Sequence, residues 1–184
     1  MRVITGSAKG KRLLTPEGLE TRPTIERVKE AIFSSLYSKV TGAELLDLFA
    51  GSGQMGIEAL SRGAKSAIFV ESNRKTSALI KQNLKNTGFE EKGKVINQDA
   101  FKFLENIKPY SFDLIFLDPP YGKNLINLAV EKIEKLNILK SSGVIVCESD
   151  STDILKESFG NISLYKRAKY GRVIISYYEK TGEE

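Results

Sequence analysis

The stretch "ELLDLFAGSGQMG", residues 44–56, is the most informative part of this 184-residue chain. Residues 44–50 form an apolar run that predicts a buried strand, and Gly51, Gly53 and Gly56 follow it with the spacing G-x-G-x-x-G. Glycines after a strand allow a sharp turn and bring a ligand against bare N–H groups at a helix N-terminus. The stretch therefore predicts a strand–turn–helix unit that binds a ligand.

Strands and helices alternate beyond this unit. The apolar patterns predict four further strands, at residues 66–71, 94–99, 112–118 and 143–150. A helical pattern follows each of them, at residues 73–88, 100–107, 124–137 and 151–160. Such alternation predicts parallel βαβ units with helices on both faces of the sheet. Two last strands, 162–170 and 172–180, have only a tight turn between them and must pair antiparallel.

The N-terminal part differs from this core. Residues 1–20 read as a short basic hairpin or arm, and residues 21–184 as one α/β domain. The domain begins with a helix over residues 21–40, for which Thr24 is a plausible N-cap.

Composition excludes several classes of chemistry. The chain has no histidine and one cysteine, Cys147, which lies in an apolar run. His-based triads, His–metal sites and an internal disulfide are therefore not expected, and no metal is predicted. No signal peptide or membrane span is recognisable, so we expect a cytoplasmic protein with no membrane partner. The sequence does not indicate an oligomer.

Positive charge is concentrated near both ends of the chain, and the formal net charge is +5. Residues 1–16 contain Arg2, Lys9, Lys11 and Arg12 without an acid, and "YKRAKYGR" (165–172) is similarly basic. These segments could be solvated basic faces or could bind nucleic-acid phosphates.

Acidic residues stand at or near the ends of three successive predicted strands. They are Asp47, Glu71 and Asp99, and strand ends form the crevice where open α/β sheets bind ligands. A dinucleotide would be repelled by Asp47, whereas S-adenosylmethionine offers an ammonium, a sulfonium and a ribose diol. We therefore favour S-adenosylmethionine over a nicotinamide cofactor.

A fourth strand end, "FDLIFLDPPYGKN" (112–124), carries a carboxylate, two prolines and a tyrosine. Pro119 and Pro120 impose a rigid, extended exit from the strand. Asp118 and neighbouring carbonyls can then accept hydrogen bonds from the exocyclic amine of an extruded base, and Tyr121 can stack on that base. Holding the amine in line with a sulfonium methyl is catalysis by orientation.

These motifs together resemble known enzymes. "DLFAGSG", "FVE", "NQDA" and "DPPY" match class I S-adenosylmethionine-dependent methyltransferases that modify exocyclic amines, which implies a Rossmann-like α/β fold. The segments "RVITGSAKGKRL", "TRPTIERVKEAIFSSL", "GIEALSRGA" and "YGRVIISYYE" are similar to the bacterial ribosomal small-subunit methyltransferase D (RsmD) family over nearly the whole chain. The expected architecture is a mostly parallel seven-stranded sheet with an antiparallel C-terminal hairpin.

The resemblance implies methylation of guanine N2 in 16S ribosomal RNA, within the small subunit or its assembly intermediate, with S-adenosylhomocysteine as by-product. The residues expected to bind the cofactor are Asp47, Phe49, Gly51, Gly53, Glu71, Ser72, Asp99 and Ala100. The residues expected to act on the base are Asp118, Pro119, Pro120 and Tyr121. The residues expected to contact RNA are Arg2, Lys9, Lys11, Arg12, Arg22, Thr24, Lys169 and Arg172.

Three alternatives remain open at this point. "DPPY" is shared with adenine-N6 methyltransferases, although 184 residues leave little room for a DNA target-recognition domain. A second alternative is an inactive RNA-binding module in ribosome assembly. A nicotinamide dehydrogenase comes last.

Overall fold

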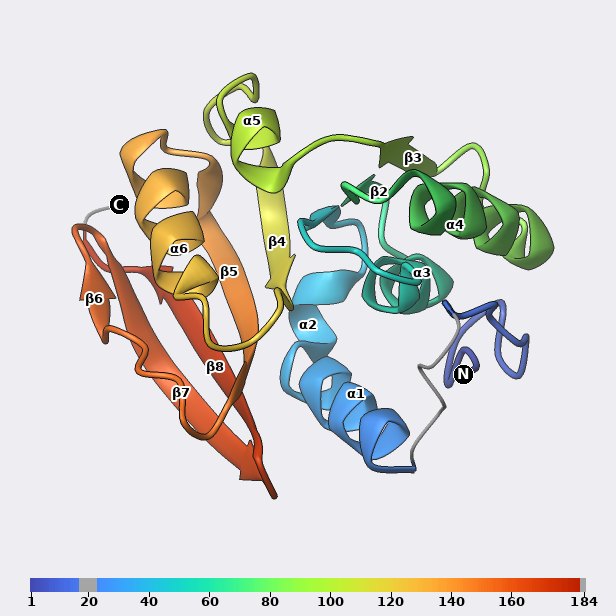
Figure 1. Cartoon of the computed structure of the whole chain (residues 1–184), viewed down its shortest axis with the longest axis horizontal. Helices are drawn as coiled ribbons and strands as arrows, with labels where there is room; N and C mark the ends of the chain where they lie inside the picture. The colour runs from blue at the N-terminus through green and yellow to red at the C-terminus, as the bar shows by residue number, and fades with distance from the viewer. Residues whose placement is uncertain (17–22, 183–184) are drawn as a thin grey trace.

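A computed structural model describes residues 1–16 and 23–182, in which one mixed sheet forms the centre of the molecule (Figure 1). The sheet has eight strands in the order β3-β2-β1-β4-β5-β8-β7-β6. The strands are β1 (Glu44–Asp47), β2 (Ser66–Val70), β3 (Gly93–Ile96), β4 (Phe112–Leu117), β5 (Leu139–Asp150), β6 (Ser158–Phe159), β7 (Ile162–Tyr170) and β8 (Val173–Lys180). The helices are α1 (Pro23–Ser35), α2 (Tyr37–Val40), α3 (Gln54–Ser61), α4 (Arg74–Thr87), α5 (Ala100–Leu104) and α6 (Leu125–Lys135).

The sheet is parallel from β3 to β5 and antiparallel from β5 to β6. Parallel neighbours require crossover connections, and the helices between the strands supply them. The long β7–β8 hairpin adds to the free side of β5, as the two-strand ending of the sequence predicted. The α/β class and the antiparallel C-terminal strands are therefore confirmed.

Two apolar cores lie on opposite faces of the sheet. One contains buried side chains of α1, α2, α3 and α4, and the other contains those of α5 and α6. Successive residues of each strand alternate between the two cores, for example Phe116 in the first and Leu117 in the second. This double coverage explains why the central strands read as continuous apolar runs.

The glycine turn depends on close packing between α3 and β2. A Cβ atom on Gly56 would clash with the ring of Phe69. One on Gly53 would come within 3.0 Å of Ile80 Cγ2. Gly53 also adopts φ 76° at the start of α3, a left-handed conformation that favours glycine. Two of the three motif glycines therefore serve packing and the turn.

One predicted helix and the strand count were wrong. Residues 151–160 contain no helix, and β6 pairs there with β7, which gives eight strands where seven were expected. Asp150 Oδ1 accepts hydrogen bonds from the backbone N–H and hydroxyl of Thr152, and Asp153 Oδ2 accepts one from the Asp150 N–H. Such local side-chain hydrogen bonds compete with the hydrogen bonds of a helix. Residues that follow Asp150 therefore form a turn, although their sequence pattern resembles that of a short helix.

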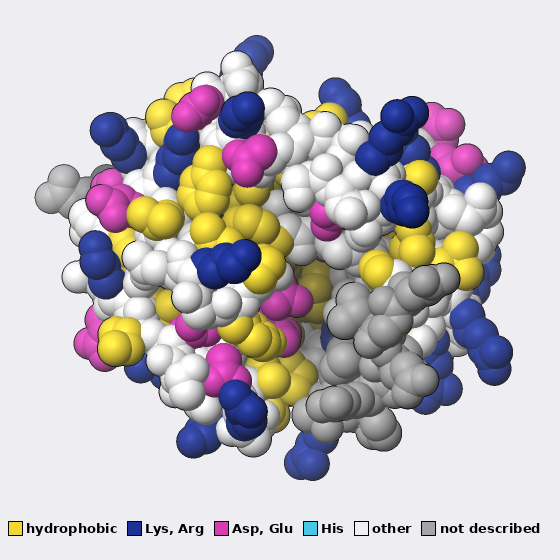
Figure 2. Space-filling model, viewed as in Figure 1, with side chains coloured by type: hydrophobic (Ala, Val, Ile, Leu, Met, Phe, Trp, Pro, Cys, Tyr) yellow, Lys and Arg dark blue, Asp and Glu magenta, His cyan; other side chains and the backbone are white. Residues whose placement is uncertain are grey.

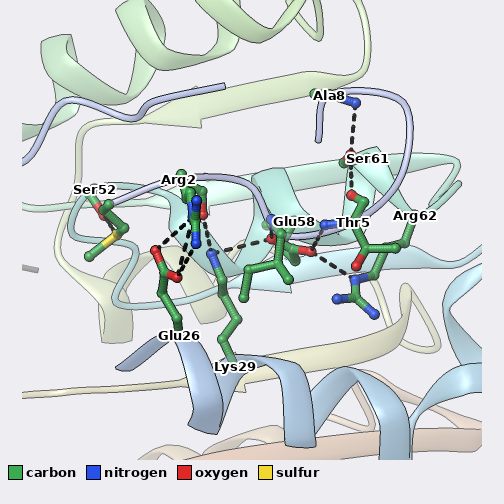
Figure 3. Close-up of polar contacts among 12 residues, drawn as sticks. Arg2, Thr5, Ala8, Glu26, Lys29, Ser52, Glu58, Ser61 and Arg62 are labelled. Carbon is green, nitrogen blue, oxygen red and sulfur yellow. Dashed lines mark hydrogen bonds and ion pairs between the residues drawn. The ribbon is translucent and has the colours of Figure 1, made fainter. Parts of the chain in front are cut away.

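The N-terminal segment is a small hairpin that packs on α3. Arg2 and Arg12 form an antiparallel bridge, and Val3, Ala8 and Leu13 are buried in the first core. Glu58 of α3 accepts hydrogen bonds from the backbone N–H groups of Ile4 and Thr5 (Figure 3). The hairpin is thus joined to the domain by both apolar and polar contacts.

No helix in the described ranges is both long enough and apolar enough to cross a membrane.

Candidate active site

A cavity of about 590 Å³ opens at the carboxyl ends of the parallel strands. Figure 2 shows a hollow near the centre of one face, with acidic and hydrophobic side chains at its wall. Five carboxylates, each at or near the carboxyl end of a different strand from β1 to β5, line the cavity, namely Asp47, Glu71, Asp99, Asp118 and Glu148. Lys29 is the one cationic side chain among the described lining residues. The cavity is therefore suited to a ligand with positive charge and hydrogen-bond donors.

Most of the predicted cofactor-binding residues meet at this cavity. The residues that line it are Asp47, Phe49, Gly51, Glu71, Ser72, Asp99 and Ala100. Gly53 does not line it and lies behind the turn, where it packs against Ile80 and Phe69. Gly51, unlike Gly53, does not pack against other residues, since a Cβ atom at this position would meet open space. Its φ of 52° still favours glycine.

Asp47 is the last paired residue of β1 and is almost completely buried. Its Oδ2 accepts a hydrogen bond of 3.1 Å from the Gly56 N–H, which ties the strand end to the start of α3. Burial raises the pKa of Asp47 to about 7, because desolvation outweighs the hydrogen bond from Gly56. A cationic group in the cavity would stabilise the ionised form.

Glu71 links the glycine turn to the next strand end. Its Oε2 accepts a hydrogen bond from the Gly51 N–H (3.1 Å), and its Oε1 accepts one from the Asn73 N–H (2.7 Å). Asp99 is the N-cap of α5, since its Oδ1 accepts hydrogen bonds from Phe101 and Lys102. Both carboxylates thus hold the loops that carry them while they face the cavity.

The predicted base-handling residues also line the cavity. They follow β4 directly and are Asp118, Pro119, Pro120 and Tyr121. The surface of Asp118 that is exposed faces the cavity, and protein atoms enclose the rest of its carboxyl group. Burial raises the pKa of Asp118 above its ordinary range, and Glu148 and Asp47 raise it further by repulsion. A second cavity of about 320 Å³ is lined by Pro119, Pro120 and Tyr121 as well, so this loop separates two hollows.

Sequence reasoning missed Glu148, which β5 places in the cavity. The Tyr121 hydroxyl donates a hydrogen bond of 3.1 Å to Glu148 Oε1. Glu148 lies inside an apolar run, "GVIVCES", which signalled a strand but no site. Its place beside Asp118 follows only from the register of the β4–β5 pair, which the sequence pattern does not reveal.

Lys29 and Gln54 were also missed. Lys29 is buried between α1 and α3, where its Nζ lies 3.2 Å from Glu58 Oε2 and donates to the Arg2 carbonyl (Figure 3). Desolvation lowers the pKa of Lys29, although Glu58 opposes this change. Gln54 lines the cavity, and its Oε1 is buried without a hydrogen-bond partner among residues 1–16 and 23–182.

The predicted RNA-contacting residues lie in different environments. Arg2 forms an exposed ion pair with Glu26, the exposed Arg172 pairs with the mostly buried Asp150, and Lys11 donates to the Asn86 carbonyl. Lys9, Arg12 and Lys169 are exposed and form no ion pair within the described part of the chain. Arg22 and the side chain of Thr24 lie outside the described residues.

Residues next to both basic segments line the cavity. Met1 and Val173 both line it, and they are the chain neighbours of Arg2 and Arg172. In the described ranges, no group of three or more His, Cys, Asp or Glu side chains could hold a metal ion.

Comparison with known proteins places this architecture in a family. A family profile described as "Conserved hypothetical protein 95" matches residues 1–179. A Bacillus subtilis (strain 168) protein named "Putative rRNA methyltransferase YlbH" is 39% identical over 184 residues, covering 99% of this chain and 100% of that protein. "Ribosomal RNA small subunit methyltransferase D" of Escherichia coli (strain K12) is 32% identical, covering 100% of this chain and 91% of that protein.

A solved structure agrees with the sequence matches. "Putative methyltransferase yhhF from Escherichia coli" superposes with a TM-score of 0.88 at 33% identity, covering 100% of this chain and 99% of that one. The fold, the strand-end cavity and the profile match over nearly all residues lead to one assignment. This chain belongs to the RsmD-like methyltransferase family, whose profile is described as "Conserved hypothetical protein 95".

Proposed function

We propose that this methyltransferase transfers a methyl group from S-adenosylmethionine to the N2 amine of a guanine in small-subunit (16S) ribosomal RNA. One observation carries the proposal: the Asp118–Tyr121 loop and the acidic strand ends Asp47, Glu71 and Asp99 share one cavity. An amine-holding loop and a nucleoside-binding crevice are thereby within reach of each other. The names of the two relatives, both ribosomal RNA methyltransferases, support ribosomal RNA as the substrate.

The donor and acceptor groups of the cavity fit S-adenosylmethionine. The wall is rich in carboxylates, and the buried Gln54 Oε1 lacks a donor among the described residues. The ammonium of the cofactor would be held by Asp47 near the Gly51 turn, its ribose hydroxyls by Glu71, and its adenine by Asp99 and Ala100. When bound there, S-adenosylmethionine supplies an electrophilic methyl group.

Asp118 and Pro119 would hold the amine of the substrate. A carboxylate oxygen and a backbone carbonyl can accept one hydrogen bond from each N–H of the amine, which leaves the nitrogen lone pair directed elsewhere. The raised pKa of Asp118 also makes its carboxylate a better proton acceptor than an ordinary aspartate. Asp118 is therefore placed to orient the amine and to take up the proton that the product amine releases.

Tyr121 would supply the stacking surface for the extruded guanine. Its side chain is 47% exposed, and its hydroxyl is fixed by the hydrogen bond to Glu148. A fixed ring beside the amine-binding oxygens defines the plane of a stacked base. Orientation of this kind is a large part of catalysis when no covalent intermediate forms.

The basic segments next to the cavity are suited to the RNA backbone. Arg2 is in an exposed ion pair with Glu26, which contributes little and can be exchanged for a phosphate contact, and the Arg172 side chain is itself exposed although its partner Asp150 is mostly buried. Lys9, Arg12 and Lys169 remain exposed. We therefore place the phosphates of the RNA on the N-terminal hairpin and on the β7–β8 hairpin.

The test is incubation with methyl-labelled S-adenosylmethionine and small ribosomal subunits from cells that lack this activity. The RNA is then digested to nucleosides, and label is expected in N2-methylguanosine. Label in N6-methyladenosine would indicate the adenine alternative. Retained RNA binding without any methyl transfer would indicate an assembly module instead.

A further inference from the structure

Glu148 lies directly beside Asp118 at the end of the sheet. Strands β4 and β5 pair in parallel with Leu117 opposite Cys147, so the next residues along the two strands are Asp118 and Glu148. Neighbouring strands lie about 4.8 Å apart, and the side chains of paired residues point to the same face. Leu117 and Cys147 face the second core, and Asp118 and Glu148 therefore face the cavity on the other side.

One oxygen of Glu148 is engaged and the other is available. Oε1 accepts the hydrogen bond from the Tyr121 hydroxyl, and Oε2 accepts none from the described residues. Burial raises the pKa of Glu148, and the hydrogen bond from Tyr121 opposes this rise only in part. A donor such as an N–H group placed against Oε2 would favour the ionised form, which can only accept hydrogen bonds. Glu148 thus presents an acceptor next to the predicted amine site.

We propose that Glu148 selects guanine by accepting a hydrogen bond from its N1–H, while Asp118 and Pro119 hold its N2 amine. This inference rests on the proposed function. The Watson–Crick edge of guanine carries the N1–H and N2–H donors side by side, and adjacent carboxylates match them. Adenine carries an acceptor at N1, which a carboxylate at this position would repel. Glu148 is therefore a specificity-determining residue for the base.

A purely structural role for Glu148 predicts a different result. In that case Glu148 only holds the Tyr121 ring, and its replacement would slow transfer to every base by the same factor. Glutamine retains an oxygen that can accept the Tyr121 hydrogen bond, so Glu148→Gln largely preserves ring placement. Glutamine also has an N–H₂ group, which can donate to a base that carries an acceptor at N1.

The experiment compares two bases at the target nucleotide, which is first mapped by nuclease digestion and mass spectrometry. Small subunits are reconstituted with RNA ligated to contain either guanine or 2,6-diaminopurine at that position. Diaminopurine retains the 2-amine and has an acceptor at N1. Initial rates of methyl transfer are measured with both substrates for the wild-type chain, Glu148→Gln and Tyr121→Phe.

The wild-type chain should prefer guanine by about 100-fold or more, because a site built around a substrate N–H rejects analogues that lack it. In Glu148→Gln this preference should fall at least about tenfold, as one lost charge-assisted hydrogen bond would give. Tyr121→Phe should slow both reactions by a similar factor and keep the preference. Calorimetric binding of S-adenosylhomocysteine verifies that each variant is folded, and Glu148→Ala should lose the preference as well.

An unchanged guanine preference in both Glu148 variants would overturn the inference, since Glu148 would then act only on Tyr121. In that outcome N2-methylguanosine still forms and the proposed function stands. A wild-type chain that forms no N2-methylguanosine would overturn the proposed function and this inference together.

Discussion

Lys29 Nζ and Glu58 Oε2 form an ion pair of 3.2 Å in which the side chains are 2% and 0% exposed. Glu58 also accepts hydrogen bonds from Arg62 and from two backbone N–H groups of the N-terminal hairpin (Figure 3). Lys29 lines the cavity and donates to the Arg2 carbonyl. This pair therefore joins α1, α3 and the hairpin at the wall of the candidate active site.

Replacement of Glu58 by alanine should strongly destabilise the fold. It would leave the buried Lys29 without its ionic partner and remove the acceptor of two part-buried backbone N–H groups, and breaking a buried pair in this way costs about 3–5 kcal/mol. Urea denaturation measures the loss. The matched control is Glu26→Ala, which removes an exposed partner of Arg2 and should cost at most about 1 kcal/mol. Equal losses in both variants would contradict the importance of the buried pair.

Replacement of Asp118 by asparagine should impair transfer much more than cofactor binding. Asparagine keeps one acceptor for the amine but cannot take up a proton, so kcat should fall by about 10²–10⁴-fold. Calorimetry with S-adenosylhomocysteine should show nearly unchanged affinity. The control is Asp113→Asn on the same strand, at the far end of β4, where Asp113 pairs with Lys140. Comparable loss of both binding and transfer in Asp118→Asn would indicate a structural role.

Cofactor binding should depend on pH through Asp47. Its raised pKa of about 7 means that the ligand-free carboxyl is mostly protonated below pH 7, and only the ionised form attracts an ammonium. The affinity for S-adenosylhomocysteine should therefore fall as the pH is lowered from 7.5 to 5.5, by at most about tenfold per pH unit. Asp47→Asn should bind more weakly at pH 7.5 and lose most of this dependence. A wild-type affinity that is flat over this range would exclude Asp47 as the ammonium partner.

Replacement of Gly56 by alanine should destabilise the chain although alanine favours helices. The added methyl group would overlap the Phe69 ring, and overpacking typically costs about 1–3 kcal/mol. This exceeds the gain in helix propensity, which is at most about 1 kcal/mol. Thermal and urea unfolding measure the difference. The double variant Gly56→Ala/Phe69→Leu should recover part of the loss; a greater loss would argue against this overlap.

Neutralising Lys9 and Arg12 together, each to glutamine, should weaken RNA binding and flatten its salt dependence. Each lost phosphate contact on single-stranded RNA reduces the slope of log K against log salt by about 0.7. Filter binding with 16S ribosomal RNA at several salt concentrations gives the slope. Lys65→Gln is the control, because Lys65 pairs with Glu44 at the amino ends of the parallel strands, away from the cavity. A double variant with the wild-type slope would place the RNA elsewhere.

Local patterns in the sequence were sufficient for most of the fold. Apolar runs and their turns located the central strands along the chain, and α4 begins after its N-cap Asn73 and ends at its C-cap Gly88. The failure at residues 151–160 has a local cause as well, because Asp150 and Asp153 bond to nearby backbone groups. The polar and apolar residues of such a turn have the same spacing as in a short helix, so the two are difficult to distinguish from sequence.

The meeting of the acidic strand-end residues could also be predicted from the sequence. Asp47, Glu71, Asp99 and Asp118 stand at or near strand ends in order, and parallel strands end at one edge, so their convergence on one cavity follows from spacing. The neighbours of these residues were decided by tertiary structure. Glu148 lies beside Asp118 because β5 pairs with β4, and Lys29 lies in the cavity wall because Glu58 holds it there. Periodicity reports only local backbone geometry, whereas contacts between distant residues arise from strand register and helix packing.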